Sequence, residues 1–211
     1  MTHSFAAAYD ATAALQVENL ACRFGLRPVF SGLSFTLAAG GARAITGVNG
    51  AGKTSLLRLV AGLAQPDAGR ITLSGATGNL KHHTHYIGHA DGLKADLSVA
   101  ETLRFETALA GRGNDEAALA DALGLAAHMT VQRVGDLSAG QRRRLGVARL
   151  LAAPRQIWLL DEPMAALDKA GRAWMERLAA THLAGGGMIV AATHEALSFA
   201  PDTLSLDGHA T

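Results

Sequence analysis

The sequence has one cysteine, no long apolar run and almost no net charge. Cys22 alone cannot form an intramolecular disulfide or a cysteine-rich metal site, which fits a reducing compartment. The 19 Lys and Arg residues against 18 Asp and Glu leave a formal charge of +1, so no overall basic field indicates a nucleic-acid-binding protein. No apolar stretch approaches the roughly 18 residues of a membrane-spanning helix. These absences favour a cytosolic protein that binds any anion locally.

The 211 residues, 49% of them apolar, are enough for one domain with its own core. Residues 1–14 lack the basic start of a signal peptide and are predicted to be a disordered leader, and residues 207–211 a tail. Strands are expected at 15–20, 33–37, 42–48, 71–73, 85–87, 157–161 and 188–193, and helices at 53–61, 98–109, 115–123, 141–152 and 169–182. Because the apolar strands alternate with helices, we predict an α/β domain over 15–206 with a parallel sheet and a helical insertion at about 91–153.

A glycine-rich segment lies between a predicted strand and a predicted helix. Its pattern, Gly-Val-Asn-Gly-Ala-Gly-Lys-Thr from residue 47, is that of a phosphate-binding loop, in which backbone N–H groups and a helix N-terminus face the phosphates. Lys53 would neutralise the β- and γ-phosphates, and the Thr54 hydroxyl would bind Mg²⁺. A glycine-rich turn without a ligand is the alternative. The candidate ATP-binding residues here are Gly47, Val48, Asn49, Gly50, Ala51, Gly52, Lys53, Thr54 and Ser55.

Two adjacent carboxylates follow the apolar strand at 157–161. Ligands of open α/β sheets bind at the carboxyl ends of the strands, so Asp161 is a candidate for the second Mg²⁺ ligand. Glu162 is one residue further along and is a candidate general base for water. An apolar strand that simply ends in two acidic residues is the alternative.

A second anion site is predicted at the start of the helix near residue 141. Ser138 can cap this helix, and Gly140 allows a ligand to approach its N-terminus. A capped basic helix without a ligand is the alternative. The segment Leu137, Ser138, Ala139, Gly140 and Gln141 resembles the signature motif of the ATP-binding-cassette (ABC) ATPases.

The resemblance extends over roughly residues 15–206 and implies further roles. It implies a P-loop NTPase fold with a small antiparallel β subdomain and a helical insertion, and a homodimer in which each signature motif contacts ATP bound to the other chain. It places Phe24 against the adenine, and His194 beside the γ-phosphate and the attacking water. Ala166, Leu167 and Asp168 correspond to a loop that couples the two sites across the dimer.

One position departs from the ABC pattern. Where most members carry a glutamine, this sequence has His89, so a metal-binding role for His89 is open. The sequence around His89 resembles that of the ATPase subunits of cytochrome c maturation complexes. That resemblance implies haem export or release of a haem-loaded chaperone, with a transmembrane subunit CcmB and with CcmC, at the cytoplasmic face of the bacterial inner membrane. The alternatives are another ABC importer or exporter, or a soluble non-transport ABC ATPase.

Two basic clusters are expected to have no ligand. The histidines at 82–85 lack a cysteine or carboxylate that would complete a metal or haem site, so a solvated loop is predicted. Arg142, Arg143 and Arg144 point in three directions on a helix and are predicted to be solvated or at an interface, not to bind nucleic acid.

Overall fold

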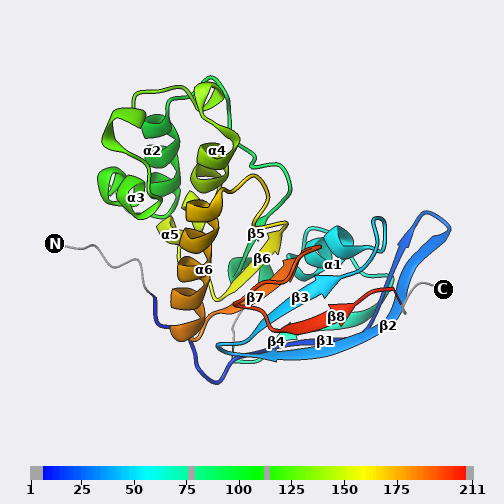
Figure 1. Ribbon diagram of the computed structural model, residues 1–211. Helices are drawn as coiled ribbons and strands as arrows, with labels where there is room; N and C mark the ends of the chain where they lie inside the picture. The colour runs from blue at the N-terminus through cyan, green and yellow to red at the C-terminus, as the bar shows by residue number, and fades with distance from the viewer. Residues whose placement is uncertain (1–6, 76–78, 112–114, 208–211) are drawn as a thin grey trace. The chain divides into compact units, whose positions relative to one another are not determined.

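The computed structural model describes residues 7–75, 79–111 and 115–207, and the chain divides into two compact units (Figure 1). The helical unit comprises Met1–Ala7, His89–Pro154 and Met164–Met175. The sheet unit comprises Ala8–Gly88, Arg155–Pro163 and Glu176–Thr211. Among the described helices, none has both the length and the apolar character needed to cross a membrane.

The sheet unit contains two sheets. A three-stranded antiparallel sheet has the order β2-β1-β4, and a five-stranded sheet with parallel pairing has the order β5-β6-β7-β3-β8. The strands are β1 (Ala14–Phe24), β2 (Arg27–Ala38), β3 (Ala42–Thr46), β4 (Ala68–Leu73), β5 (Thr84–Ile87), β6 (Ile157–Asp161), β7 (Met188–Ala192) and β8 (Asp202–Ser205). The unit also holds α1 (Lys53–Val60) and a short 3₁₀ turn, Leu80–His82. The predicted α/β fold with an additional antiparallel sheet is confirmed.

The core of the sheet unit explains why the central strands are apolar along their whole length. All residues of β6 and β7 are buried, because other elements cover both faces of a parallel sheet. Leu56 and Leu57 of α1 belong to the same apolar cluster and are fully buried. Each such side chain contributes roughly 1.5–3 kcal/mol by its removal from water.

The structure differs from the sequence-based prediction at one strand and one helix. Strand β8 was not predicted, because it has only four residues and they are mostly exposed. It is identified as a strand by its parallel pairing with β3. The helix expected at 141–152 is two helices, α4 (Ala139–Gly146) and α5 (Ala148–Ala152), which meet at Val147.

Part of the predicted leader is packed on the sheet unit. The backbone N–H of Tyr9 donates to the Gly185 carbonyl at 2.9 Å, and Gln156 Nε2 donates to the Asp10 carbonyl at 2.8 Å. The prediction of disorder up to residue 14 is therefore wrong for this part, because main-chain hydrogen bonds hold it. Residues 1–6 lie outside the described part of the chain.

A buried histidine lies under this packed segment. The ring of His182, on α6 (Lys169–Ala184), stacks on Trp158 with 3.7 Å between ring centroids and meets Tyr9 edge-on. His182 Nε2 lies 3.3 Å from the Met188 carbonyl. Burial lowers the pKa of His182 to about 4, although its backbone hydrogen bonds act in the opposite direction. The imidazole is therefore neutral in the folded protein at pH 7.

We expect His182 to make folding stability depend on pH. Its ordinary pKa is about 6.5, so below that pH the unfolded chain binds a proton that the folded chain does not bind until about pH 4. The free energy of unfolding should fall by roughly 3 kcal/mol from this group between pH 6.5 and 4. Urea unfolding at several pH values measures the fall. His182→Phe, which keeps an aromatic ring against Trp158, should flatten it, whereas the exposed control His82→Phe should not; equal slopes in all three proteins would contradict the assignment.

The helical unit contains the predicted insertion. Its helices are α2 (Val99–Leu109), α3 (Glu116–Ala122), α4, α5 and the start of α6, with 3₁₀ turns at Ala127–Met129 and Val134–Asp136. A capping box begins α2, because the Ser98 hydroxyl accepts from the Glu101 N–H and the Glu101 carboxylate accepts from the Ser98 N–H.

Candidate nucleotide-binding site

The glycine-rich segment forms a tight loop between β3 and α1. Gly52 is the N-cap of α1 and has φ of 99°, a conformation that favours glycine. A Cβ atom at Gly52 would also collide with the side chain of Val29. Only a residue without a side chain fits there, so the loop can turn directly into the helix and present its N–H groups at the helix N-terminus.

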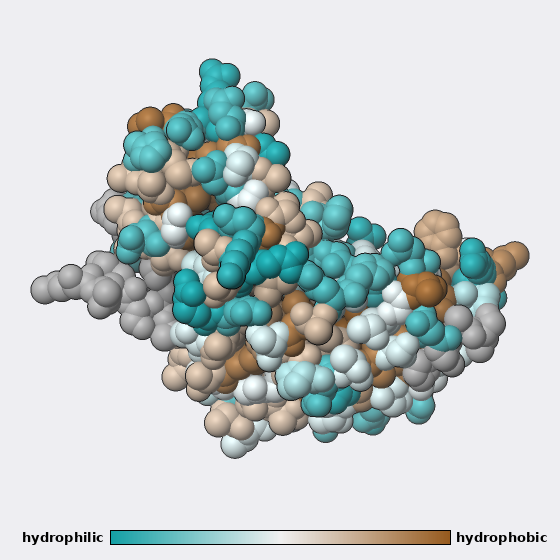
Figure 2. Space-filling view, viewed as in Figure 1, coloured by the Kyte–Doolittle hydropathy of each residue, from teal (hydrophilic) through white to brown (hydrophobic). Residues whose placement is uncertain are grey.

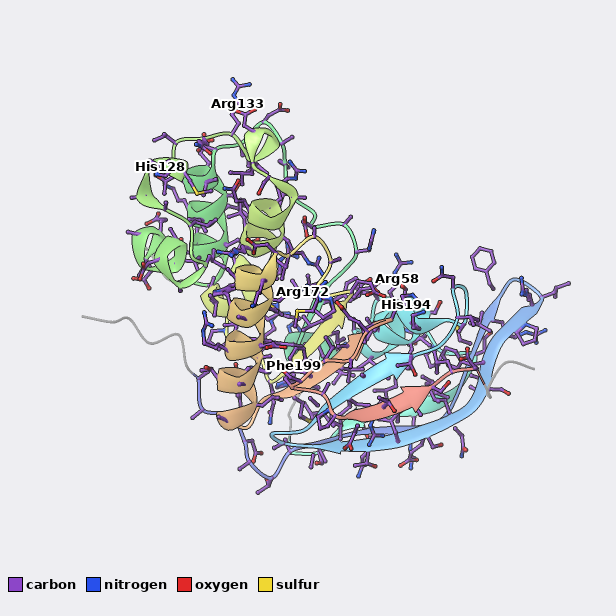
Figure 3. All side chains as sticks on the ribbon, in the orientation of Figure 1. Arg58, His128, Arg133, Arg172, His194 and Phe199 are labelled. Atoms are coloured by element: carbon purple, nitrogen blue, oxygen red, sulfur yellow. The ribbon has the colours of Figure 1, made fainter. Side chains whose placement is uncertain are left out.

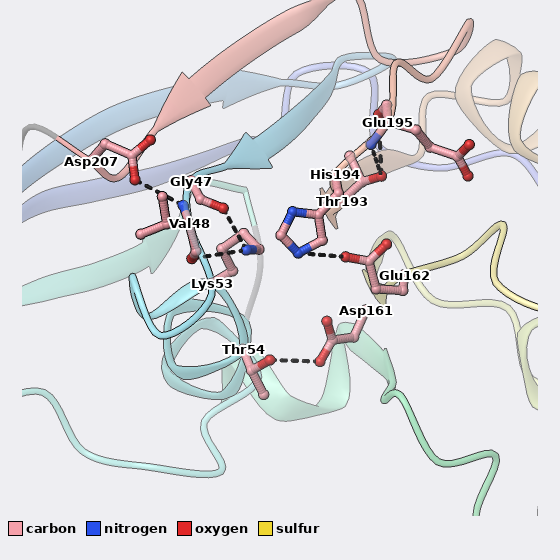
Figure 4. A network of polar contacts seen from close by, with 10 residues as sticks. All are labelled: Gly47, Val48, Lys53, Thr54, Asp161, Glu162, Thr193, His194, Glu195 and Asp207. Atoms are coloured by element: carbon pink, nitrogen blue, oxygen red, sulfur yellow. Dashed lines mark hydrogen bonds and ion pairs between the residues drawn. The ribbon is translucent and has the colours of Figure 1, made fainter.

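Lys53 lies within the curve of this loop. Its side chain is 8% exposed, and Nζ donates to the Gly47 carbonyl at 2.7 Å and to the Val48 carbonyl at 3.2 Å (Figure 4). The ammonium group and the loop N–H groups thus gather on one short segment. A cation together with convergent N–H donors suits a phosphate chain.

Asp207 supports the loop and was missed by sequence reasoning, which assigned residues 207–211 to a tail. Its Oδ1 accepts from the backbone N–H of Val48 at 2.9 Å (Figure 4). A Cβ atom at Gly47 would lie 3.0 Å from the same oxygen, so the two segments approach closely. No sequence pattern indicates this contact, because it forms only when strand β8 places Asp207 beside a loop that lies 159 residues earlier in the chain.

The two predicted metal-binding residues lie together. The Thr54 hydroxyl donates to Asp161 Oδ2 at 2.8 Å, and Asp161 is 6% exposed at the end of β6. No cluster of three or more His, Cys, Asp or Glu side chains suited to a metal occurs among the described residues. One hydroxyl and one carboxylate fit Mg²⁺, which commonly takes its other ligands from substrate phosphates and water.

Tyr86 is a further residue that the sequence did not indicate. Its hydroxyl lies close enough to the side chains of Arg58 and Asp161 for both to influence its pKa. The pKa of Tyr86 is raised, chiefly because the phenol is partly buried, with the negative charge of Asp161 adding to the effect. The hydroxyl therefore stays protonated and can donate to the carboxylate. Asp161 thus accepts the hydrogen bond from Thr54 and has the protonated hydroxyl of Tyr86 nearby.

Glu162 and His194 face each other across the ends of neighbouring strands. Glu162 follows β6, and its Oε1 lies 3.5 Å from His194 Nε2, beyond the end of β7 (Figures 3 and 4). Glu162 has φ of 49°, a left-handed conformation that costs roughly 1–3 kcal/mol in a residue other than glycine. The main chain supports it, since the Glu162 N–H donates to the Ala192 carbonyl at 2.9 Å. The His194 side chain is 52% exposed, so this pair is open to a water molecule.

Phe24 lies at the tip of the β1–β2 hairpin. Phe24 is 85% exposed and nearby Leu26 is 90% exposed, and apolar atoms stand out at this end of the space-filling view (Figure 2). An aromatic face this open to solvent is available for stacking against a base. Its assignment to adenine stays a prediction.

The predicted signature motif lies in the helical unit at the N-terminus of α4. Ser138 is the N-cap, its hydroxyl accepts from the Gln141 N–H at 3.2 Å, and the Gln141 side chain accepts from the Ser138 N–H at 2.8 Å. The predicted cap is confirmed. A Cβ atom at Gly140 would lie 3.1 Å from the Ala166 carbonyl, so the signature helix packs against the predicted coupling loop.

The coupling loop has a second contact with α4. Asp168 Oδ1 lies 3.7 Å from Arg144 Nη2 and accepts from the Gly171 N–H at 2.7 Å. Ala166 has φ of 61°, which gives the loop a sharp turn. This packing between 137–141 and 166–168 could not be predicted from the sequence.

His89 belongs to the helical unit, whereas Thr54 and Asp161 belong to the sheet unit. Its role as a metal ligand stays a prediction. Two other expectations were partly wrong: His85, predicted to be in a solvated loop, is 6% exposed because it lies on β5, and Arg143 is 5% exposed because it faces a carboxylate.

Comparison with known proteins shows the family to which the chain belongs. The family pattern described as "ABC transporter" matches residues 30–165. The chain belongs to the ABC transporter family as a CcmA-like ATPase. It is 51% identical to the "Cytochrome c biogenesis ATP-binding export protein CcmA" of Rhodopseudomonas palustris strain BisB5, over 88% of this chain and 94% of the relative.

Two further comparisons agree with this placement. The protein of the same name from Nitrobacter winogradskyi is 48% identical, over 93% of this chain and 99% of the relative. A solved structure described as a dimeric bacterial ABC transporter cassette aligns with a TM-score of 0.78 and 19% identity, over 92% of this chain and 94% of the other. The predicted ABC-type fold of this CcmA-like chain is therefore confirmed, and the chain is an ATP-hydrolysing enzyme of that type.

Proposed function

We propose that the chain is the ATPase subunit of an ABC-type membrane complex for cytochrome c maturation, in which ATP hydrolysis drives haem export or release of a haem-loaded chaperone. The observation that carries this proposal is the 51% identity, over 88% of the chain, to a protein named for cytochrome c biogenesis and export. An ATPase for another importer or exporter would have the same nucleotide site and a different membrane partner.

The proposed working unit is a homodimer with two ATP molecules. In each site, Lys53 and the N–H groups of residues 47–54 bind the phosphates of ATP on one chain. The signature helix of the other chain presents its capped N-terminus, Ser138 to Gly140, to the γ-phosphate of that ATP. The dimeric ABC cassette to which this chain is similar supports the arrangement.

The residues at the strand ends divide the chemistry between them. Thr54 and Asp161 would hold Mg²⁺, which when bound offsets the negative charge on the phosphates. Glu162 accepts a proton from the attacking water, and His194, 3.5 Å from that carboxylate, orients the water toward the γ-phosphate. Tyr86, whose hydroxyl lies near Asp161, would help to orient that carboxylate.

The proposed membrane partner is the transmembrane subunit CcmB, in a complex with CcmC, at the cytoplasmic face of the bacterial inner membrane. Phe105 and Leu109 on α2 are 58% and 70% exposed and lie four residues apart, hence on one side of the helix. This exposed apolar pair suits contact with a protein surface.

Co-purification from detergent-solubilised membranes tests the proposal. The tagged chain, co-expressed with CcmB and CcmC, should be recovered with both. The variant Phe105→Ser/Leu109→Ser should lose them and keep its ATPase activity, because neither side chain belongs to the nucleotide site. Recovery only with ribosomes or DNA would favour a non-transport ABC ATPase and contradict the proposal.

A further inference from the structure

The three consecutive arginines after the signature motif each contact a different part of the helical unit. Arg142 Nη1 donates to the carbonyl of Leu137, the first residue of the motif. Arg144 reaches the Gly124 carbonyl and Asp168. Arg143 Nη1 donates to Asp91 Oδ1 at 3.0 Å, in an ion pair whose side chains are 5% and 24% exposed. The arginines therefore join α4 to its surroundings, and the Arg143 contact is the most buried of these ion pairs.

Asp91 belongs to the segment that begins with His89 and has no helix or strand up to Leu97. The later part of this segment is held by its main chain, because the Gly135 N–H donates to the Ala95 carbonyl and the Val134 N–H to the Leu97 carbonyl, at 3.0 and 2.8 Å. In the earlier part, the Asp91 side chain is bound by Arg143. The position of His89 within the helical unit therefore depends on what Asp91 contacts.

The surface of α4 is shaped to receive Asp91. Gly146 lies three residues after Arg143, on the same side of the helix. A Cβ atom at Gly146 would lie 3.0 Å from Asp91 Cβ and 3.2 Å from its carboxyl carbon, so a larger residue would displace the aspartate. Asp91 is thus fixed by packing at Gly146 as well as by the charge of Arg143.

Burial makes this pair hard to separate. A guanidinium group that is 5% exposed has little water to replace its partner, and a buried charge that loses its counter-charge is strongly unfavourable. A displacement of Asp91 must therefore carry Arg143, and with it α4, in the same direction. Ser138 and Gly140 are within about one and a half turns of Arg143 on this helix.

We propose that Asp91 and Arg143 are positioning residues that make the segment at His89 and the signature helix move as one body. Through this pair, the N-terminus of α4 takes the orientation in which it meets the nucleotide bound to the second chain. The inference rests on the proposed two-chain arrangement of the sites. Neither residue contacts the nucleotide itself.

The test is ATP-driven dimerisation in a Glu162→Gln background, measured by sedimentation with ATP and Mg²⁺. The variant Asp91→Ala/Arg143→Met removes both charges, so no unpaired charge stays buried and folding should be retained. We expect its dimerisation to be weaker by roughly tenfold, while the affinity of the single chain for ATP is unchanged. The single variant Arg143→Lys keeps the cation opposite Asp91, so it should retain most of the dimerisation of the Glu162→Gln parent. The matched control, Arg104→Met/Glu116→Ala, removes an ion pair of the same unit whose side chains are 69% and 27% exposed, and it should have no effect.

The outcomes separate this inference from the proposed function. A double variant that dimerises as strongly as the Glu162→Gln parent overturns the positioning role alone. So does a double variant that loses its cooperative thermal transition or its ATP binding, since the pair would then be merely structural. A parent that stays monomeric with ATP overturns the two-chain arrangement, and the positioning role with it.

Discussion

Replacing Glu162 by glutamine should lower the ATPase rate by a factor of roughly 10²–10⁴ and leave ATP binding intact. The amide keeps the size of the side chain but cannot take a proton from water. Glu162 lies 3.5 Å from His194 in a left-handed conformation that the Ala192 carbonyl supports, so its orientation is set by the main chain. Glutamine should therefore keep the local geometry and remove only the base. Phosphate release measures the rate, and titration with a fluorescent ATP analogue measures binding.

The control for this substitution is Glu176→Gln, on the part of α6 that belongs to the sheet unit. It removes one carboxylate from the same unit and should leave the rate unchanged. A Glu162→Gln protein that hydrolyses ATP at the normal rate would exclude Glu162 as the base. Loss of ATP binding in that variant would instead indicate a role in holding the nucleotide.

Replacing Lys53 by alanine should reduce ATP affinity by roughly ten- to a hundredfold, because a hydrogen bond to a charged group contributes about 1.5–3 kcal/mol. The side chain is 8% exposed and lies in the curve of the loop, where its ammonium group already meets two carbonyl oxygens. Alanine removes the cation, but the path of the loop should not change, because the glycines determine it. Binding of the same fluorescent analogue measures the loss.

An exposed lysine of the same unit provides the comparison for Lys53. Lys81→Ala removes an equal charge from a surface turn and should bind ATP as the parent does. Equal affinities for the Lys53 and Lys81 variants would mean that the loop binds phosphate without its lysine.

The local parts of the site could be predicted from the sequence because each depends on a short run of residues. The phosphate loop is specified by glycines at positions where a side chain would collide, as at Gly52. The cap at Ser138 is specified by the glutamine three residues later. Asp161 ends a strand whose five apolar and acidic residues are all buried, which is the pattern of a central parallel strand.

The contacts that support the site could not be predicted, since they join residues far apart in the chain. Asp207 reaches the phosphate loop only because β8 pairs with β3. Tyr86 reaches Asp161 because β5 pairs with β6 in parallel. Asp91 reaches Arg143 across 52 residues, and the sequence offers three arginines without saying which one is buried. Tertiary pairing, not local pattern, selects these residues.

The mass of the Glu162→Gln protein in sedimentation, with and without ATP and Mg²⁺, shows whether one chain holds half of each of two ATP sites. We expect a monomer without nucleotide and a dimer with one ATP bound per chain when nucleotide is present. A protein that binds ATP fully and remains a monomer at saturating nucleotide would contradict this expectation.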